Sequence, residues 1–194
     1  MAGLDYNISH AGDWVVLAAG QGRIGVDVMK TTDNRIDRLS EFFRLMTKQF
    51  TDKEWQTIRK SGKDEQQLQT FFRHWTLKES YVKAIGTGLN LDLKTLEFHL
   101  QSEELVEGKV EEGTGLWLDG KKTDLWKFYE TKLDCEHFVS VAMEGIEEKP
   151  EPFIILTVQQ VFSMFDSQPN YGLLRTLDPE DFSKFQRKTS IKPF

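Results

Sequence analysis

The chain has 194 residues, a formal net charge of -6 and a hydrophobic content of 39%, a composition typical of a soluble globular protein with one domain or two small ones. The negative charge argues against nucleic acid as the main partner, and the apolar runs are too short to cross a membrane. One cysteine excludes an intrachain disulfide, so we expect a reducing compartment, with the cytoplasm as the default.

Two strand-like runs lie near the start of the chain. Residues 14–19 are apolar, residues 23–29 alternate in polarity, and Gly20-Gln21-Gly22 between them has the composition of a turn. The two runs therefore predict a β-hairpin. The preceding residues 7–10 suit a turn or the entry to a strand.

An aspartate lies inside the second run. Because strand side chains alternate, Asp27 faces away from Val26 and Val28 and shares its face with Gly25. Aspartate is disfavoured in strands, and a glycine there leaves room for something to approach the backbone. A solvent-facing Asp27 on a half-exposed strand is an equally good interpretation.

The middle of the chain is helical in pattern. Residues 39–50 predict a first helix, and Thr51-Asp52-Lys53-Glu54 has the form of a capping box, so a second helix should run to about Lys60. A long helix should begin at Asp64 and stop at Gly86.

Apolar side chains of the long helix fall on one stripe at helical spacing, namely Phe71, Trp75, Val82 and Ile85. Lys78 lies in the middle of this stripe, where an unpaired ammonium would be costly, so it must reach solvent or find an anionic partner. Glu79 and Lys83 lie beside it, one turn apart. An acidic and a basic residue at this spacing also commonly form an ion pair on the solvated surface of a helix.

After Gly86 the pattern returns to short strands, expected at residues 96–100, 116–118, 125–129 and 138–143, with a turn at Gly120-Lys121-Lys122. Strands, helices and strands again indicate an α+β domain, an antiparallel sheet packed against a long central helix. We expect this domain to cover residues 1–145. Residues 146–194 would form a linker and a C-terminal extension, with a short helix opened by Asp178-Pro179.

The charged residues are unevenly distributed. Basic residues are in excess between Arg44 and Lys83, and acidic residues are in excess between Gln101 and Glu151. This pattern is compatible with two solvated faces or with a basic surface that attracts an anionic partner.

Asp27 and Glu79 together suggest a reaction class. Magnesium binds through one or two protein carboxylates plus substrate phosphates. If the strand aspartate and the helix glutamate meet, with lysines beside the glutamate, they would hold a metal-bound pyrophosphate. Spacing alone does not show that the two acids meet.

The order of these motifs resembles the 4′-phosphopantetheinyl transferase superfamily. Gly25-Val26-Asp27, followed on the long helix by Trp75-x-x-Lys78-Glu79-Ser80-x-x-Lys83, looks like the paired motif of the family. Asn7-Ile8-Ser9-His10 resembles the Asn-x-Ser-His element of its larger, monomeric branch. The sequence around the two other motifs, at residues 26–30 and 77–80, resembles the large eukaryotic type. The resemblance covers residues 4 to 144, and more loosely the tail.

The resemblance implies an enzyme that moves the phosphopantetheine arm of coenzyme A to a serine hydroxyl of an acyl or peptidyl carrier protein, releasing 3′,5′-ADP. It implies that Asp27 and Glu79 bind magnesium. Glu79 would also accept the serine proton, directly or through water, and Lys83 would contact the phosphates.

The resemblance further implies that Ser9 and His10 contact a phosphate of coenzyme A. Lys78 would either contact phosphate or form a structural ion pair, and Trp75 would pack in the core and orient the helix. Many bacterial members carry a second acid two residues after the aspartate. Here that position is Met29, so the ion would have fewer protein ligands and more water.

The family's larger members consist of two similar halves with the active site between them, and this chain resembles the second half. We therefore expect one half of a two-half fold, either a fragment or short isoform, or a chain that pairs with another. An exposed apolar face, and with it self-association, should follow. The alternative functions are a non-catalytic partner-binding module and another magnesium-dependent nucleotide hydrolase.

Overall fold

The computed structural model describes residues 4–32, 38–145 and 153–166, and the chain forms two compact units, Met1–Pro150 and Glu151–Phe194. Within the described part of the second unit, helix α4 covers Val158–Asp166. The predicted linker, Glu147 to Pro152, and the predicted helix at Asp178-Pro179 lie outside the described residues. No helix in the described ranges combines the length and apolarity needed to cross a membrane.

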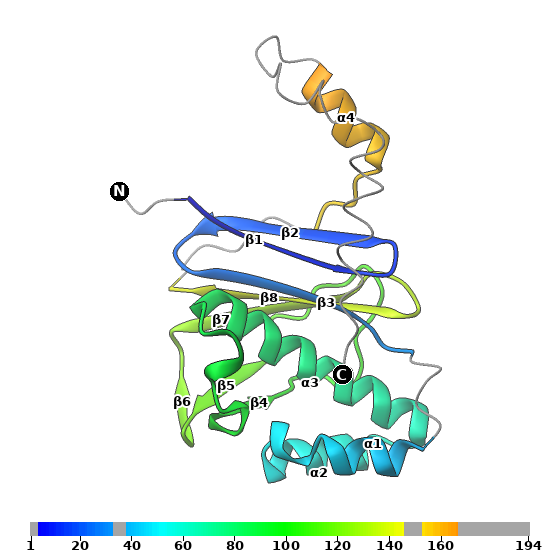
Figure 1. The fold of residues 1–194 in the computed structure, drawn as a ribbon, viewed down its shortest axis with the longest axis vertical. Coiled ribbons are helices and arrows are strands. Elements are labelled where there is room, and N and C mark those ends of the chain that lie inside the picture. The colour runs from blue at the N-terminus through cyan, green and yellow to red at the C-terminus, as the bar shows by residue number, and fades with distance from the viewer. Residues whose placement is uncertain (1–3, 33–37, 146–152, 167–194) are drawn as a thin grey trace. The chain divides into compact units, whose positions relative to one another are not determined.

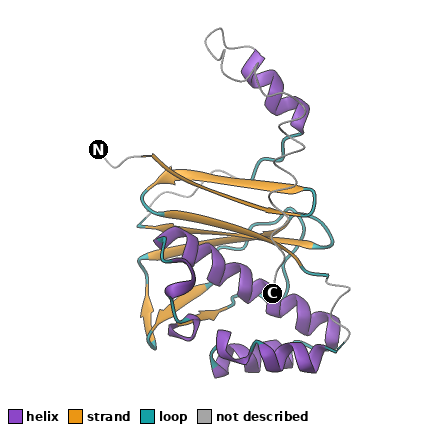
Figure 2. Ribbon diagram, viewed as in Figure 1, coloured by secondary structure: helices purple, strands orange, loops and turns teal. Residues whose placement is uncertain are grey.

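The first unit is a mixed α and β fold with antiparallel sheets, which confirms the predicted class (Figures 1 and 2). Its strands are β1 Leu4–Ala11, β2 Trp14–Gln21, β3 Ile24–Lys30, β4 Leu96–His99, β5 Gly115–Leu118, β6 Lys121–Thr123, β7 Trp126–Lys132 and β8 His137–Glu144. Its helices are α1 Leu39–Leu45, α2 Asp52–Lys60 and α3 Asp64–Ile85, with 3-10 turns at Thr47–Gln49, Gly88–Asn90 and Leu93–Thr95.

The predicted hairpin between residues 14–19 and 23–29 is wrong. β2 pairs with β1, and β3 pairs with β8, where Asp27 lies opposite Ser140. The physical reason is the two-residue loop that joins β1 to β2. Its Gly12 has φ +55°, a conformation that glycine adopts without strain and that matches the twist of a tight hairpin. Residues 7–10 are therefore part of a strand and not a turn.

β1 lies beside β3 but bonds to it through side chains (Figure 1). Three oxygens on alternate residues of β1 accept backbone N–H groups of alternate residues of β3. The pairs are Asp5 Oδ2 with Ile24 N at 3.3 Å, Asn7 Oδ1 with Val26 N at 3.1 Å and Ser9 Oγ with Val28 N at 3.3 Å. These side-chain oxygens therefore take the place of a neighbouring strand's carbonyls as acceptors for the N–H groups of Ile24, Val26 and Val28.

The predicted helical boundaries hold for two of the three helices. Thr51 and Glu54 form the capping box that begins α2, and Gly86, with φ +70°, ends α3. The first helix is shorter than predicted, because α1 ends at Leu45. The Thr47 hydroxyl donates to the carbonyls of Phe43 and Arg44, which satisfies acceptors at the end of the helix.

Helix α3 packs against β3, β8 and β4 and contributes to two apolar clusters among the described residues (Figure 1). Its Leu77 packs in an apolar cluster with Phe128 of β7 and Ala142 of β8. Its Phe71 packs in an aromatic cluster with Phe50, which follows α1 along the chain. Because α3 is buried on several sides, the position of its polar residues is set by packing around the whole helix.

Candidate active site

The backbone of α3 lies directly against β3 at Gly25. A Cβ atom built on Gly25 would lie 2.1 Å from the Ser80 carbonyl oxygen and 2.5 Å from the Ala84 nitrogen, both of which are backbone atoms of α3. Only glycine allows this approach, so the expectation that Gly25 admits another segment is confirmed. The close approach lets side chains from the same stretch of α3 reach the next inward-facing residue of β3, Asp27.

An open cavity of about 400 Å³ lies where β1, β3 and α3 meet. Its lining residues come from these three elements: Ile8, Ser9, His10, Asp27, Val28, Met29, Trp75, Glu79 and Lys83. Five of the six side chains predicted for the site therefore share one cavity. The exception is Lys78.

Asp27 is buried and its two oxygens differ. Oδ1 accepts hydrogen bonds from Lys83 Nζ at 2.7 Å and from Ser9 Oγ at 3.0 Å, whereas Oδ2 is buried without a hydrogen-bond partner. Burial raises the pKa of Asp27, and the charge of Lys83 only partly opposes this shift. One carboxylate oxygen is thus left available to a cation.

Lys83 lines the cavity and forms several hydrogen bonds there. Besides Asp27, its ammonium donates to Ser9 Oγ at 2.9 Å and to the Val26 carbonyl at 3.2 Å. The lysine side chain is 30% exposed, so it borders the cavity while holding β1 and β3 together. The Val26 carbonyl is a contact that sequence reasoning could not find, because strand carbonyls carry no side-chain signal.

Glu79 lies one helical turn before Lys83 and is half-buried. Burial raises its pKa first, and repulsion from Asp27 raises it further, while Lys83 opposes both. The two carboxylates therefore interact electrostatically, and Lys83 interacts with both of them. Such an arrangement favours a proton or an additional cation close to Glu79.

The two acids fit a magnesium site of the kind that relies on water and substrate for most of its ligands. Among the described residues no group of three or more His, Cys, Asp and Glu side chains is placed to hold a metal ion. Asp27 Oδ2 is a buried oxygen without a hydrogen-bond partner, and Glu79 lines the same cavity, so both carboxylates could contact one cation. Magnesium takes one or two carboxylates and keeps several waters, so two acids suffice.

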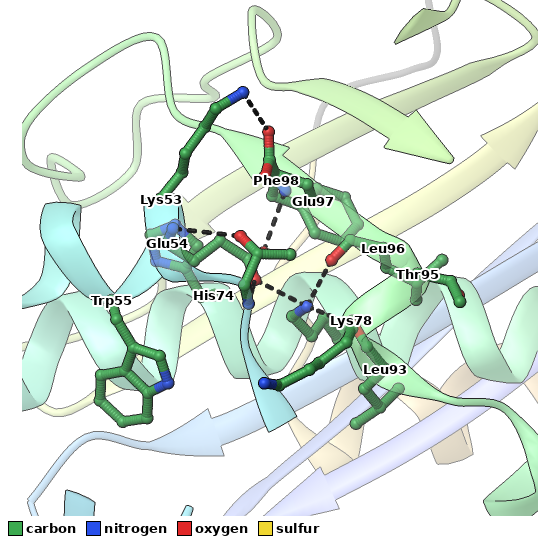
Figure 3. Close-up of polar contacts among 12 residues, drawn as sticks. Lys53, Glu54, Trp55, His74, Lys78, Leu93, Thr95, Leu96, Glu97 and Phe98 are labelled. Atoms are coloured by element: carbon green, nitrogen blue, oxygen red, sulfur yellow. Dashed lines mark hydrogen bonds and ion pairs between the residues drawn. The ribbon is translucent and has the colours of Figure 1, made fainter. Parts of the chain in front are cut away.

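Lys78 lies on another side of α3, away from the cavity, and its side chain is fully buried (Figure 3). Its ammonium pairs with Glu54 Oε2 at 2.8 Å and donates to the carbonyls of Leu93 at 2.7 Å and Leu96 at 2.5 Å. These three partners use all three N–H donors. The structure therefore assigns Lys78 the structural ion pair and corrects the expected contact with phosphate.

Trp75 both packs and lines the cavity. Its ring stacks on Phe71 with centroids 6.2 Å apart and planes inclined by 14°, as expected of a core residue that orients the helix. It also forms an apolar wall of the cavity with Met29 and Val28. The wall faces the same opening as Glu79, so one side of the cavity is suited to an uncharged group.

A second cavity of about 400 Å³ lies near the start of α3 and contains none of the predicted site residues. Its one buried cation, Arg73, forms an ion pair with Glu130 at 2.8 Å and donates to the carbonyl and hydroxyl of Ser102. Because these contacts satisfy the guanidinium, the first cavity is the better candidate for chemistry.

Comparison with known proteins gives one family. A sequence model of the 4′-phosphopantetheinyl transferase superfamily matches residues 23–142, which include Asp27, Glu79 and Lys83. The L-aminoadipate-semialdehyde dehydrogenase-phosphopantetheinyl transferase of Homo sapiens is 44% identical over 179 residues, covering 91% of this chain and 55% of the relative.

More distant relatives agree. A phosphopantetheinyl transferase of a Thraustochytrium species is 39% identical over 145 residues, covering 72% of this chain and 48% of the relative. The 4′-phosphopantetheinyl transferase of Bacillus subtilis is 31% identical over 110 residues, covering 57% of this chain and 46% of the relative. The chain thus spans about half the length of the curated relatives it matches.

Proposed function

This chain belongs to the 4′-phosphopantetheinyl transferase superfamily, and on that basis we propose that it transfers 4′-phosphopantetheine from coenzyme A to a serine hydroxyl of a carrier protein. The observation that carries the proposal is the single cavity shared by Asp27, Glu79 and Lys83. A strand and a helix that are distant in sequence bring two acids and one lysine to one opening. This combination suits a metal-bound pyrophosphate.

In the proposed reaction the serine oxygen attacks the phosphorus that carries the pantetheine arm. A new P–O bond forms to serine, the pyrophosphate P–O bond breaks, and 3′,5′-ADP leaves. Glu79 accepts the serine proton, directly or through water, because its carboxylate lines the same cavity as Asp27 and Lys83. Lys83 lies beside it to neutralise charge on the phosphates.

Asp27 through its free Oδ2 and Glu79 would hold magnesium, which when bound supplies positive charge against the pyrophosphate. Lys83, which borders the cavity, would contact a phosphate, and Ser9 and His10 on β1 would contact another phosphate of coenzyme A. The apolar wall of Trp75 and Met29 would lie along the uncharged part of the substrate.

The carrier partner is proposed from the relatives. The name of the human relative includes L-aminoadipate-semialdehyde dehydrogenase, so the carrier domain of a dehydrogenase of that kind is the first substrate to test. The single cysteine fits a cytoplasmic enzyme. Pairing of this domain with a second half, in the same chain or another, remains part of the proposal.

The test is a transfer assay with coenzyme A, magnesium and an apo carrier domain, read as the phosphopantetheine mass addition. We expect transfer by the wild-type chain. Glu79→Gln should lower the rate by at least about 100-fold, since it removes the proton acceptor and a metal ligand. Equal rates for the two proteins would refute the role of Glu79.

A non-catalytic partner-binding module is the second candidate, favoured by exposed apolar side chains on β1 and β2 such as Leu4, Tyr6 and Leu17. Calorimetry with coenzyme A and magnesium separates the two. A folded chain that releases no heat of binding would support the module, whereas saturable binding that requires magnesium would support the transferase.

A further inference from the structure

We propose that Glu54 is a positioning residue for Glu79, acting through its buried ion pair with Lys78. The proposal rests on the proposed function, because it concerns the residue assigned there as base and metal ligand. Glu54 itself lies on α2 and is not among the residues that line the cavity.

Glu54 joins three elements at one point (Figure 3). Its Oε2 accepts the Thr51 N–H at 2.9 Å and pairs with Lys78 Nζ at 2.8 Å, and its Oε1 accepts the Phe98 N–H at 3.0 Å. A glutamate that caps its own helix is ordinary, but this one is 1% exposed and also holds α3 and β4. The carboxylate therefore fixes α2, α3 and β4 relative to one another.

Lys78 completes the junction from the side of α3. Its ammonium reaches the carbonyls of Leu93 and Leu96 as well as Glu54, so none of its donors is free for a ligand. The side chains of Lys78 and Glu54 are both 0% exposed. Burial lowers the pKa of Lys78 and raises the pKa of Glu54, and each is the other's largest compensating interaction.

The junction is one residue away from the proposed base. Successive side chains of an α-helix point about 100° apart, so Lys78 holds one side of α3 while Glu79 faces the cavity. On the β3 side the backbone of α3 packs directly against Gly25. The hydroxyl oxygens of Ser80 on α3 and Ser140 on β8 are 3.2 Å apart. Rotation or sliding of α3 would move Glu79 relative to Asp27, and the Lys78–Glu54 ion pair, on the residue next to Glu79, opposes such movement from the side of α2 and β4.

Breaking the pair from either side should therefore move Glu79. Removing one partner leaves an uncompensated buried charge, which the structure can relieve only by local rearrangement or water entry. Loss of a residue that orients a metal ligand typically weakens metal affinity by about 10- to 100-fold. A direct phosphate contact by Lys78 would give a different pattern, because Glu54 would then have no effect of its own.

The matched control is the other buried ion pair of α3. Arg73 and Glu130 are 2.8 Å apart, with side chains 3% and 1% exposed, and join α3 to β7 well before Glu79 along the helix. Glu130→Gln should destabilise the chain as Glu54→Gln does. It should leave the position of Glu79 unchanged.

The experiment compares wild type, Glu54→Gln, Lys78→Met, the double variant and Glu130→Gln by calorimetry with magnesium and coenzyme A, below the unfolding temperature of each protein. We expect Glu54→Gln and Lys78→Met each to weaken magnesium-dependent binding by about 10- to 100-fold, and the double variant to be no worse than either. Glu130→Gln should bind as the wild type does.

Amide hydrogen exchange gives a readout that needs no ligand. Exchange in peptides covering residues 77–83 should accelerate in Glu54→Gln more than in Glu130→Gln. Unchanged exchange there, a loss of binding confined to Lys78→Met, or an equal loss in Glu130→Gln would each overturn the inference. A wild-type chain that binds no coenzyme A would refute the proposed function alone, and the exchange experiment would still decide the role of Glu54.

Discussion

His74 is a buried titratable side chain of α3 that takes no part in the proposed chemistry. Its ring is 0% exposed, and Nδ1 lies 2.9 Å from the Thr70 carbonyl. Burial lowers its pKa to about 4, below the ordinary value of 6.5. The imidazole is therefore neutral in the folded chain at pH values where the unfolded chain is already protonated.

The stability that His74 confers is complete above pH 6.5 and is lost as the pH falls toward 4. For a shift of this size the loss is roughly 3 kcal/mol. Urea unfolding at pH 7 and pH 4.5 measures it. His74→Gln, which does not titrate, should lose less stability over this interval than the wild type, and an equal loss in both proteins would contradict the lowered pKa.

The environment of Lys78 could be predicted from the sequence only in part. The position of Lys78 in an apolar stripe predicted that it needs an anionic partner, because burying a bare ammonium is costly. The partner, Glu54, could not be identified, since its capping box explained it fully within α2. Only the packing of α2 beside α3 shows that one carboxylate serves both purposes.

At the scale of elements, the approach of α3 to β3 depends on Gly25. Gly25→Ala would place a methyl group within 2.1 Å of the Ser80 carbonyl, and the whole helix must move to admit it. We expect a loss of about 1 to 3 kcal/mol in the free energy of unfolding. Magnesium-dependent binding of coenzyme A should be lost as well, because Glu79 and Lys83 would draw away from Asp27.

Gly20→Ala is the matched control for this substitution. A Cβ on Gly20 meets the flexible end of Met143 at 3.3 Å and no backbone atom within 4 Å. It should change both stability and binding little. If Gly25→Ala unfolds and binds like Gly20→Ala, α3 does not need glycine at this contact.

The elements most visible in the sequence were those with strong local signals. The capping box of α2 and the glycine after α3 fixed their boundaries because both are satisfied by neighbours in sequence. The order of the strands was missed because pairing depends on contacts far apart in the chain. The alternation of Asp5, Asn7 and Ser9 with apolar residues was the signal that could have revealed β1.

At the scale of the whole molecule, the predicted antiparallel α+β class follows from the order of patterns along the chain, and it is what the structure shows. The meeting of Asp27 with Glu79 does not follow from that order. It requires β3 to pair with β8 under α3, an arrangement that no local pattern specifies. The expectation that Asp27 and Glu79 share one site came from the resemblance to the family's motifs, since the local sequence pattern does not predict it.

The β1 and β2 hairpin presents an apolar face of the first unit to solvent. The exposed side chains alternate along the two strands and are Leu4, Tyr6, Ile8, Val15 and Leu17, each between 53% and 77% exposed. The register places Ile8 opposite Leu17, so these residues form one patch, and Ile8 also borders the candidate active site. A contiguous apolar patch of this kind usually packs against another chain or segment.

We therefore expect the chain to self-associate through this face as its concentration rises, because association removes apolar surface from water. Sedimentation velocity at low and high protein concentration measures this. The double variant Tyr6→Glu with Leu17→Lys should remain monomeric, since it places charges in the patch and leaves Ile8, which lines the cavity, unsubstituted. Leu45→Lys on α1 removes a similarly exposed leucine, 67% exposed, from another surface and should associate as the wild type does. A wild-type chain that stays monomeric at high concentration would show that this face is stable in water, and association that Leu45→Lys abolishes would place the interface on α1.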